Sequence, residues 1–232
     1  EIRQKICHHP KVAAHYLLEK MHRAGATKAY IVLSKGKWDI PAYFGNGSLV
    51  DMAIAYLMTD LTLGVPFTLN SAVPFLKNDR VLFGFPDILI DSDEVYIQLL
   101  ERLSAGGGDL VLGLFPAVNP QKMDMVELDE NAAVRHIRIK PDRTNLKWTW
   151  IAAAWSPAFT RFMHDYVHRY LQTIISVTDG LKGDSSKEVY FGDVIQAAIE
   201  SGLTCDRVLF PRGRYLDIGT PEDMACASRF KV

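Results

Sequence analysis

Long apolar runs are missing from this sequence. No segment reaches the ~18 consecutive apolar residues that a membrane-spanning helix needs, and the first residues lack the charged-then-apolar pattern of a secretory signal. Both absences argue against a membrane partner and against export. We therefore expect a cytoplasmic protein.

Cysteine is scarce as well. The sequence has three cysteines, Cys7, Cys205 and Cys226, an odd number with no paired spacing. A disulfide framework is thereby disfavoured, and we expect reduced thiols, which agrees with a cytoplasmic location.

Charge of one sign is nowhere concentrated. The formal net charge is −1, and no run of five or six like charges occurs. Such a distribution argues against nucleic acid and membrane surfaces as partners. Any anionic ligand must therefore be held by a local site.

What the sequence does contain is an alternation of strand and helix signals. Its 232 residues and apolar fraction of 48 % suffice for one large α/β domain. Residues 12–24 have apolar positions at helical spacing, and Gly25 follows as a typical helix end. Continuous apolar runs, typical of strands buried on both faces, occur in "KAYIVLS", "AIAYLM", "RVLFGF" and "DLVLGLF". Between these runs lie two helical stretches, "PFTLNSAVPFL" and the segment after "DSDE". This alternation of strand and helix predicts a single Rossmann-like, doubly wound domain over residues 1–232, with a mostly parallel central sheet.

The pattern changes after residue 120. Two alternating strands around a turn in "MVELDENAAVRHIRIKP" predict an antiparallel insertion at about 120–155 that could roof a cleft. Helices are predicted in "WSPAFTRFMHDYVHRYL", with Ser156 as cap, and in "EVYFGDVIQAAIESG", closed by Gly202. The final strands are "DRVLFP" and "RYLDIG".

Two aspartates are the leading site candidates by position. Asp87 and Asp217 each follow an apolar strand, where ligands of open α/β sheets bind. A converging carboxylate pair suits Mg²⁺, which takes oxygen ligands and keeps several waters. Either residue alone could equally serve a turn or a cap, and "TPED" beside Asp217 has the composition of a capped helix start.

Five stretches in register resemble the sugar-1-phosphate nucleotidyltransferases, the family of glucose-1-phosphate thymidylyltransferase and UDP-glucose pyrophosphorylase. They are "HYLLEKMHRAGATKAYIV", "LTLGVPFTL", "VLFGFPDILI", "IRIKP" and "YLDIGTPEDM". The resemblance covers nearly the whole chain. It implies Mg²⁺-dependent attack of a sugar 1-phosphate on a nucleoside triphosphate, which yields a nucleoside diphosphate sugar and pyrophosphate.

The same resemblance implies residue roles. Asp87 and Asp217 would hold the metal, with Asp87 also on the nucleotide side. Lys140 of "IRIKP" would contact the sugar phosphate, and Gly64 would let the nucleoside approach the backbone. Such chemistry depends on positioning and charge neutralisation, and these four residues are the predicted catalytic and binding set.

Three departures from the family pattern stand out. The family's glycine-rich loop and its lysine are not among the 232 residues, so we expect either a longer natural product or a non-catalytic binding or regulatory relative. Ile139 replaces the sugar-binding glutamate, and Asp124 lies near a sugar-contacting glycine of the family. The base, the sugar and a homo-oligomeric state all stay open.

Three rival motifs have structural interpretations as well. Asp91 and Asp93 in "DSD" resemble the metal motif of nucleotide-sugar glycosyltransferases, an alternative to helix capping. His164 and His168 have the i, i+4 spacing of zinc proteases but lack the general-base glutamate, which favours a solvated helix face. "AGGGD" at 105–109 follows a helix, which favours a loop over a phosphate cradle.

Overall fold

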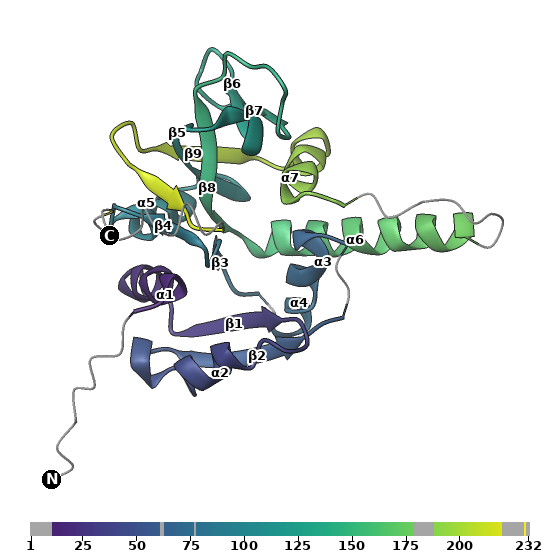
Figure 1. Ribbon diagram of the computed structural model, residues 1–232. Coiled ribbons are helices and arrows are strands. Elements are labelled where there is room, and N and C mark those ends of the chain that lie inside the picture. The colour runs from purple at the N-terminus through teal and green to yellow at the C-terminus, as the bar shows by residue number, and fades with distance from the viewer. Residues whose placement is uncertain (1–10, 61–62, 77, 179–187, 220–229, 231–232) are drawn as a thin grey trace, which may run out of the picture.

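A mixed six-stranded sheet forms the centre of the molecule (Figure 1). The structure, a computed structural model, describes residues 11–60, 63–76, 78–178, 188–219 and 230. The sheet has the order β7-β6-β8-β5-β9, and β3 also pairs with β8. Its strands are β3 (Val81–Gly84), β5 (Leu110–Pro116), β6 (Met125–Leu128), β7 (Val134–Arg138), β8 (Trp148–Trp155) and β9 (Cys205–Leu209).

The prediction of a mostly parallel sheet is wrong because of β8. This strand runs antiparallel to β5, β3 and β6, whereas β5 and β9 are parallel. β5 lies along one edge of β8, and β3 and β6 share the other edge at opposite ends. The predicted antiparallel insertion is confirmed in the β6–β7 pair, but its continuation β8 is a central strand and not part of a roof.

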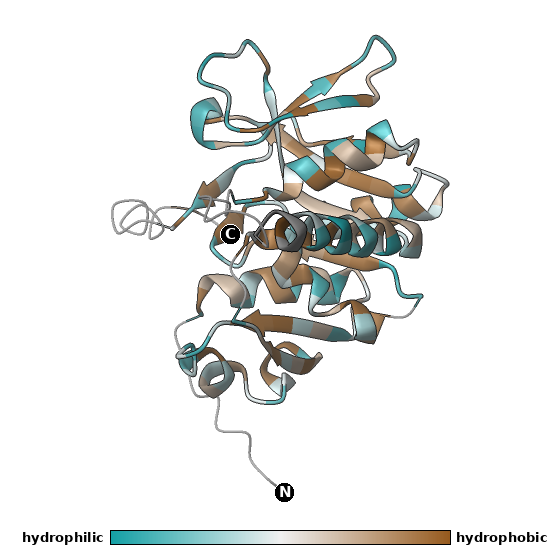
Figure 2. Ribbon diagram, turned by 90° about the vertical axis from the view of Figure 1, so that its right-hand side faces the viewer, coloured by the Kyte–Doolittle hydropathy of each residue, from teal (hydrophilic) through white to brown (hydrophobic). Residues whose placement is uncertain are grey.

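Helices cover both faces of this sheet. On one face α1 (Ala13–Arg23) and α5 (Val95–Ser104) pack against inward side chains such as Val111 and Ala152. On the other, α6 (Pro157–Thr178) and α7 (Phe191–Glu200) pack against Leu112 and Ala153. The strands are mostly hydrophobic and the outer sides of the helices hydrophilic in Figure 2. Alternate residues of one strand thus supply two separate cores.

Two smaller strand pairs flank the sheet. β1 (Lys28–Leu33) pairs in parallel with β2 (Ala53–Met58). β4 (Ile88–Ile90) pairs antiparallel with β10 (Tyr215–Asp217). The remaining described elements are short: α2 (Asp39–Phe44), η1 (Ser48–Val50), α3 (Val65–Asn70), α4 (Val73–Leu76) and η2 (Pro120–Lys122).

Several predicted helix boundaries are confirmed. α1 is followed by Gly25 at φ 94°, and Gly202 follows α7 at φ 89°, both in the left-handed region that glycine tolerates best. α6 begins after Ser156, whose hydroxyl accepts the Ala158 amide at 3.2 Å. None of the helices in the described part of the chain combines the length and the apolar character that crossing a bilayer requires.

Candidate functional site

Asp87 and Asp217 come together through main-chain pairing. Asp87 lies in the turn between β3 and β4, and Asp217 ends β10, where it is paired with Ile88. The Ile218 amide donates to the Asp87 carbonyl at 2.9 Å, which extends that pairing by one bond. The backbone therefore positions both aspartates, as their place in the sequence predicted.

Their carboxylates face the same point. A Cβ added at Gly219 would lie 3.1 Å from Asp217 Oδ1 and 3.7 Å from Asp87 Oδ2. The Gly219 amide donates to Asp217 Oδ1 at 2.9 Å and fixes that side chain. Although Asp87 as a residue is exposed, its carboxyl is partly shielded, and this burial raises its pKa; the charge of Asp217 raises the pKa further.

This pair fits a hard divalent cation. Two carboxylates that repel one another are relieved by a bound cation, and their oxygens are the ligands that Mg²⁺ prefers. Among the described residues no group of three or more His, Cys, Asp and Glu side chains could hold a metal. A cation here would have two protein ligands and would keep water or substrate oxygens, as Mg²⁺ commonly does.

Lys140 lies at the end of β7 and is exposed. Its φ is +36°, an uncommon value for a residue with a side chain. The ammonium Nζ lies 4.2 Å from the centroid of the Tyr190 ring, within the range of a cation–π contact. The predicted phosphate-binding cation is therefore held in place by an aromatic face.

Asp124 lies next to Lys140, in a position the sequence marked only as a departure. Burial raises the pKa of its carboxyl to about 6; the Lys140 charge opposes this effect and the Asp193 charge adds to it. The backbone of Lys140 also lies close enough to lower this pKa. Asp193 itself accepts the Tyr190 amide at 2.9 Å. No sequence signal predicted this acidic environment, because it depends on the approach of β6, β7 and α7.

Gly64 begins α3 and touches the segment that carries Tyr190. It has φ 118°, and a Cβ there would lie 2.1 Å from the Val189 carbonyl oxygen. The Val189 amide donates to the Leu63 carbonyl at 3.0 Å. Close backbone approach thus accounts for the glycine, and its contact with a nucleoside stays a prediction.

A row of aromatic rings connects the two ends of the candidate site. The Phe85 ring, two residues before Asp87, lies 5.4 Å from the Trp150 ring, which in turn lies 5.6 Å from Phe191. Trp150 also lies close enough to Asp124 to lower its pKa. Aromatic contacts therefore link the segment before Asp87 to Asp124, which lies beside Lys140.

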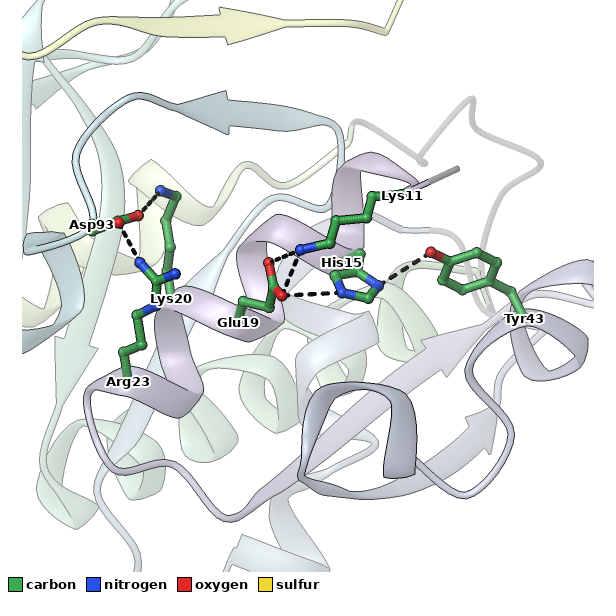
Figure 3. Close-up of polar contacts among 7 residues, drawn as sticks. All are labelled: Lys11, His15, Glu19, Lys20, Arg23, Tyr43 and Asp93. Carbon is green, nitrogen blue, oxygen red and sulfur yellow. Dashed lines mark hydrogen bonds and ion pairs between the residues drawn. The ribbon is translucent and has the colours of Figure 1, made fainter. Parts of the chain in front are cut away.

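The aspartates of the "DSD" motif are engaged in structural contacts. Asp93 accepts Lys20 Nζ at 2.6 Å and also pairs with Arg23, both from α1 (Figure 3). Asp91 binds the backbone amide and the guanidinium of Arg214 at 2.9 and 3.0 Å, just before β10. Neither Asp91 nor Asp93 caps α5, whereas the Ser92 hydroxyl between them accepts the Glu94 amide at 3.4 Å. The two aspartate pairings hold α1 and β10 onto the loop before α5.

The two remaining motifs have structural partners as well. His164 Nδ1 lies 2.8 Å from Asn70 Oδ1, and its ring lies 4.3 Å from that of His168. No third metal ligand joins them among the described residues. Residues 105–109 form the loop between α5 and β5, as expected, with Gly106 and Gly108 at positive φ.

Comparison with known proteins finds relatives among the nucleotidyltransferases. The low-salt glycan biosynthesis nucleotidyltransferase Agl11 of Haloferax volcanii is 25 % identical over 222 residues, which cover 94 % of this chain. Glucose-1-phosphate thymidylyltransferase of Neisseria meningitidis is 22 % identical over 186 residues, or 80 % of the chain. The chain is related to the sugar-1-phosphate nucleotidyltransferases. It spans 57 % and 59 % of the lengths of these two relatives, and no protein-family model matches the sequence.

Solved structures support the fold. A Bacillus anthracis protein assigned as a glucose-1-phosphate thymidylyltransferase, in complex with sucrose, superposes with a TM-score of 0.76 at 15 % identity, over 94 % of this chain and 82 % of that one. UDP-glucose pyrophosphorylase in complex with UDP-glucose gives 0.71 at 13 % identity, over 94 % and 85 %. At such identities the likeness establishes the mixed α/β fold alone.

Proposed function

We propose that this chain carries the nucleotidyl-transfer site of an enzyme that joins a nucleoside triphosphate to a sugar 1-phosphate. The observation that supports it most is the convergence of Asp87 and Asp217 on one point. The relatives described above are nucleotidyltransferases, which favours this reaction over other uses of a carboxylate pair.

The reaction needs no covalent nucleophile from the protein. An oxygen of the sugar 1-phosphate attacks the α-phosphorus of the triphosphate, one P–O bond forms, and the bond to pyrophosphate breaks in line. Bound Mg²⁺ would supply neutralisation of the phosphate charges. Asp87 and Asp217 would hold that ion, with Asp87 on the nucleotide side.

Lys140 binds the phosphate of the sugar substrate. Its ammonium is placed over the Tyr190 ring, beside the Asp124 carboxylate. Holding the cation in advance lowers the cost of ordering it when the phosphate arrives. The segment at Gly64 lies against Val189 and completes the nucleoside side of the proposed cleft.

The decisive experiment measures pyrophosphate release by the natural gene product, with Mg²⁺, over a grid of nucleoside triphosphates and sugar 1-phosphates. Release that depends on both substrates and on the metal would establish the reaction and identify both substrates. A folded protein that is silent across the grid would contradict catalysis and favour a non-catalytic binding relative. We place the reaction in the cytoplasm.

A further inference from the structure

Trp150 carries a buried polar group that lacks a well-formed hydrogen bond to any residue the structure describes. The residue is 4 % exposed, and its indole Nε1 makes no such bond within the described part of the chain. Its ring is packed between Phe85 and Phe191, so the indole cannot turn freely toward water. Buried N–H groups are almost always satisfied, and an orphaned one points to an acceptor supplied from outside.

The Asp124 carboxylate lies close to this N–H. The indole lies close enough to lower the pKa of Asp124, yet the two do not reach hydrogen-bond geometry. With a pKa of about 6, the carboxyl is ionised near neutral pH and can only accept hydrogen bonds. A donor and an acceptor therefore lie side by side without satisfying one another.

Because Gly192 has no side chain, it leaves room for the side chains of Asp124 and Ile139. A Cβ there would lie 2.7 Å from Asp124 Oδ2 and 2.4 Å from Ile139 Cδ1, so any larger residue would displace both side chains. A third neighbour, Ile137 Cγ2, would lie at 3.0 Å. The carboxylate thus stands against an apolar wall, where a hydrogen bond is stronger than in open water.

The charges around Asp124 indicate which kind of ligand group could bind beside it. Lys140 is the cation of the cluster, and Asp124 and Asp193 are its two anions. A phosphate can pair with the ammonium, but a second anionic group beside Asp124 would be repelled. A neutral hydroxyl, which donates and accepts at once, matches the carboxylate and the indole N–H together.

We propose that Asp124 and Trp150 form a subsite that reads one hydroxyl of the sugar whose phosphate Lys140 binds. The hydroxyl donates to the Asp124 carboxylate and accepts from Trp150 Nε1. This inference rests on the proposed function and adds a specificity element to it: the substrate is a neutral sugar 1-phosphate with a free hydroxyl at that position.

The test compares four proteins on the preferred sugar 1-phosphate and on its deoxy analogues, each lacking one hydroxyl. For the wild type, kcat/KM should fall by about 10- to 100-fold for one analogue. Asp124→Asn and Trp150→Phe should accept that analogue nearly as well as the parent sugar. Asp124→Asn keeps the shape of the side chain, and Trp150→Phe keeps an aromatic ring between Phe85 and Phe191 while it removes the N–H. Trp148→Phe, on the same strand, is the matched control and should keep the wild-type discrimination.

A second readout uses charge. A sugar 1-phosphate with a carboxylate in place of a hydroxymethyl group should be a poor substrate for the wild type and a better one for Asp124→Asn. Pyrophosphate release with unaltered discrimination in both variants would overturn the subsite and leave the proposed function standing. Absence of pyrophosphate release from every substrate pair would overturn the proposed function, and the subsite with it.

Discussion

The carboxylates of Asp87 and Asp217 are brought to one point by main-chain hydrogen bonds, and the Gly219 amide also donates to Asp217 Oδ1. Asp217 is paired with Ile88 across β10 and β4, and the Ile218 amide binds the Asp87 carbonyl. The backbone therefore determines how close the two charges lie. Removing one carboxylate should alter the charge at this point while leaving the strand pair intact.

Replacing either aspartate should abolish turnover without unfolding the chain. We expect Asp87→Asn and Asp217→Asn each to lower kcat/KM for pyrophosphate release by about 100-fold or more, because each loses a ligand for the cation. The unfolding midpoint should stay close to that of the wild type. Asp39→Asn, at an exposed aspartate of α2, is the control and should be fully active. Near-normal turnover of either site variant would remove that aspartate from the mechanism.

The ion pairs of α1 should matter for stability and not for chemistry. Lys20 has a side chain only 4 % exposed, and Asp93 is its partner at 2.6 Å (Figure 3). Asp93→Ala leaves that ammonium buried and unpaired, so we expect the free energy of unfolding to fall by about 1–3 kcal/mol in urea titrations. Lys20→Met should cost less, since it removes the buried charge itself.

The double variant completes this test. Asp93→Ala combined with Lys20→Met should be more stable than Asp93→Ala alone, because no unpaired charge remains. If the losses in free energy of unfolding of the two single variants simply add in the double variant, the ion pair contributes nothing to stability. Abolished turnover in a folded Asp93→Ala protein would instead revive the glycosyltransferase interpretation of this motif.

The sequence patterns predicted where strands and helices lie better than they predicted whether the strands pair in parallel or antiparallel. Apolar runs and glycines located most strands and helix ends because both signals are local. β8 is different: "WTWIAAAW" is buried on both faces, and such a run looks the same in a parallel and in an antiparallel strand. Its central, antiparallel position depends on pairing with β5, β3 and β6, which no local signal encodes.

The two halves of the candidate site differ in the same way. Asp87 and Asp217 were predictable because each stands at the end of an apolar strand. Asp124 was visible only as an unexpected acid, since its contact with Trp150 depends on the register of β6 against β8. That Ile139 and Asp124 both converge on Gly192 could be learned only from the folded chain.

Gly192 should tolerate no side chain. In Gly192→Ala the new Cβ would press on Asp124 Oδ2 and Ile139 Cδ1, and we expect about 1–3 kcal/mol of lost stability together with a raised KM for the sugar 1-phosphate. Gly113→Ala is the matched control in a buried strand, where the nearest atoms would lie at 3.4 Å or more. If the alanine at 192 leaves both stability and KM unchanged, the crowding around Asp124 is not real.

Asp124 should also make stability depend on pH in an unusual direction. Burial raises its pKa from 3.8 to about 6, so the folded chain holds this proton more tightly than the unfolded chain. The resulting stabilisation is complete below pH 3.8 and is lost as the pH rises through about 6. Asp124→Asn has no such proton, and the wild type should therefore lose stability relative to it between pH 5 and pH 7.5 in urea titrations.

Asp206 provides a control of opposite sign. Burial acts to raise its pKa, but hydrogen bonds from Arg207 and Arg102 outweigh burial and lower it. The stabilisation from Asp206 is therefore present at neutral pH and is lost as the pH falls through its lowered pKa. Relative to Asp206→Asn the wild type should become less stable on acidification, whereas relative to Asp124→Asn it should become more stable. If the wild type changes stability with pH in the same direction relative to both variants, Asp124 does not lie in the shielded, acidic environment on which the hydroxyl subsite depends.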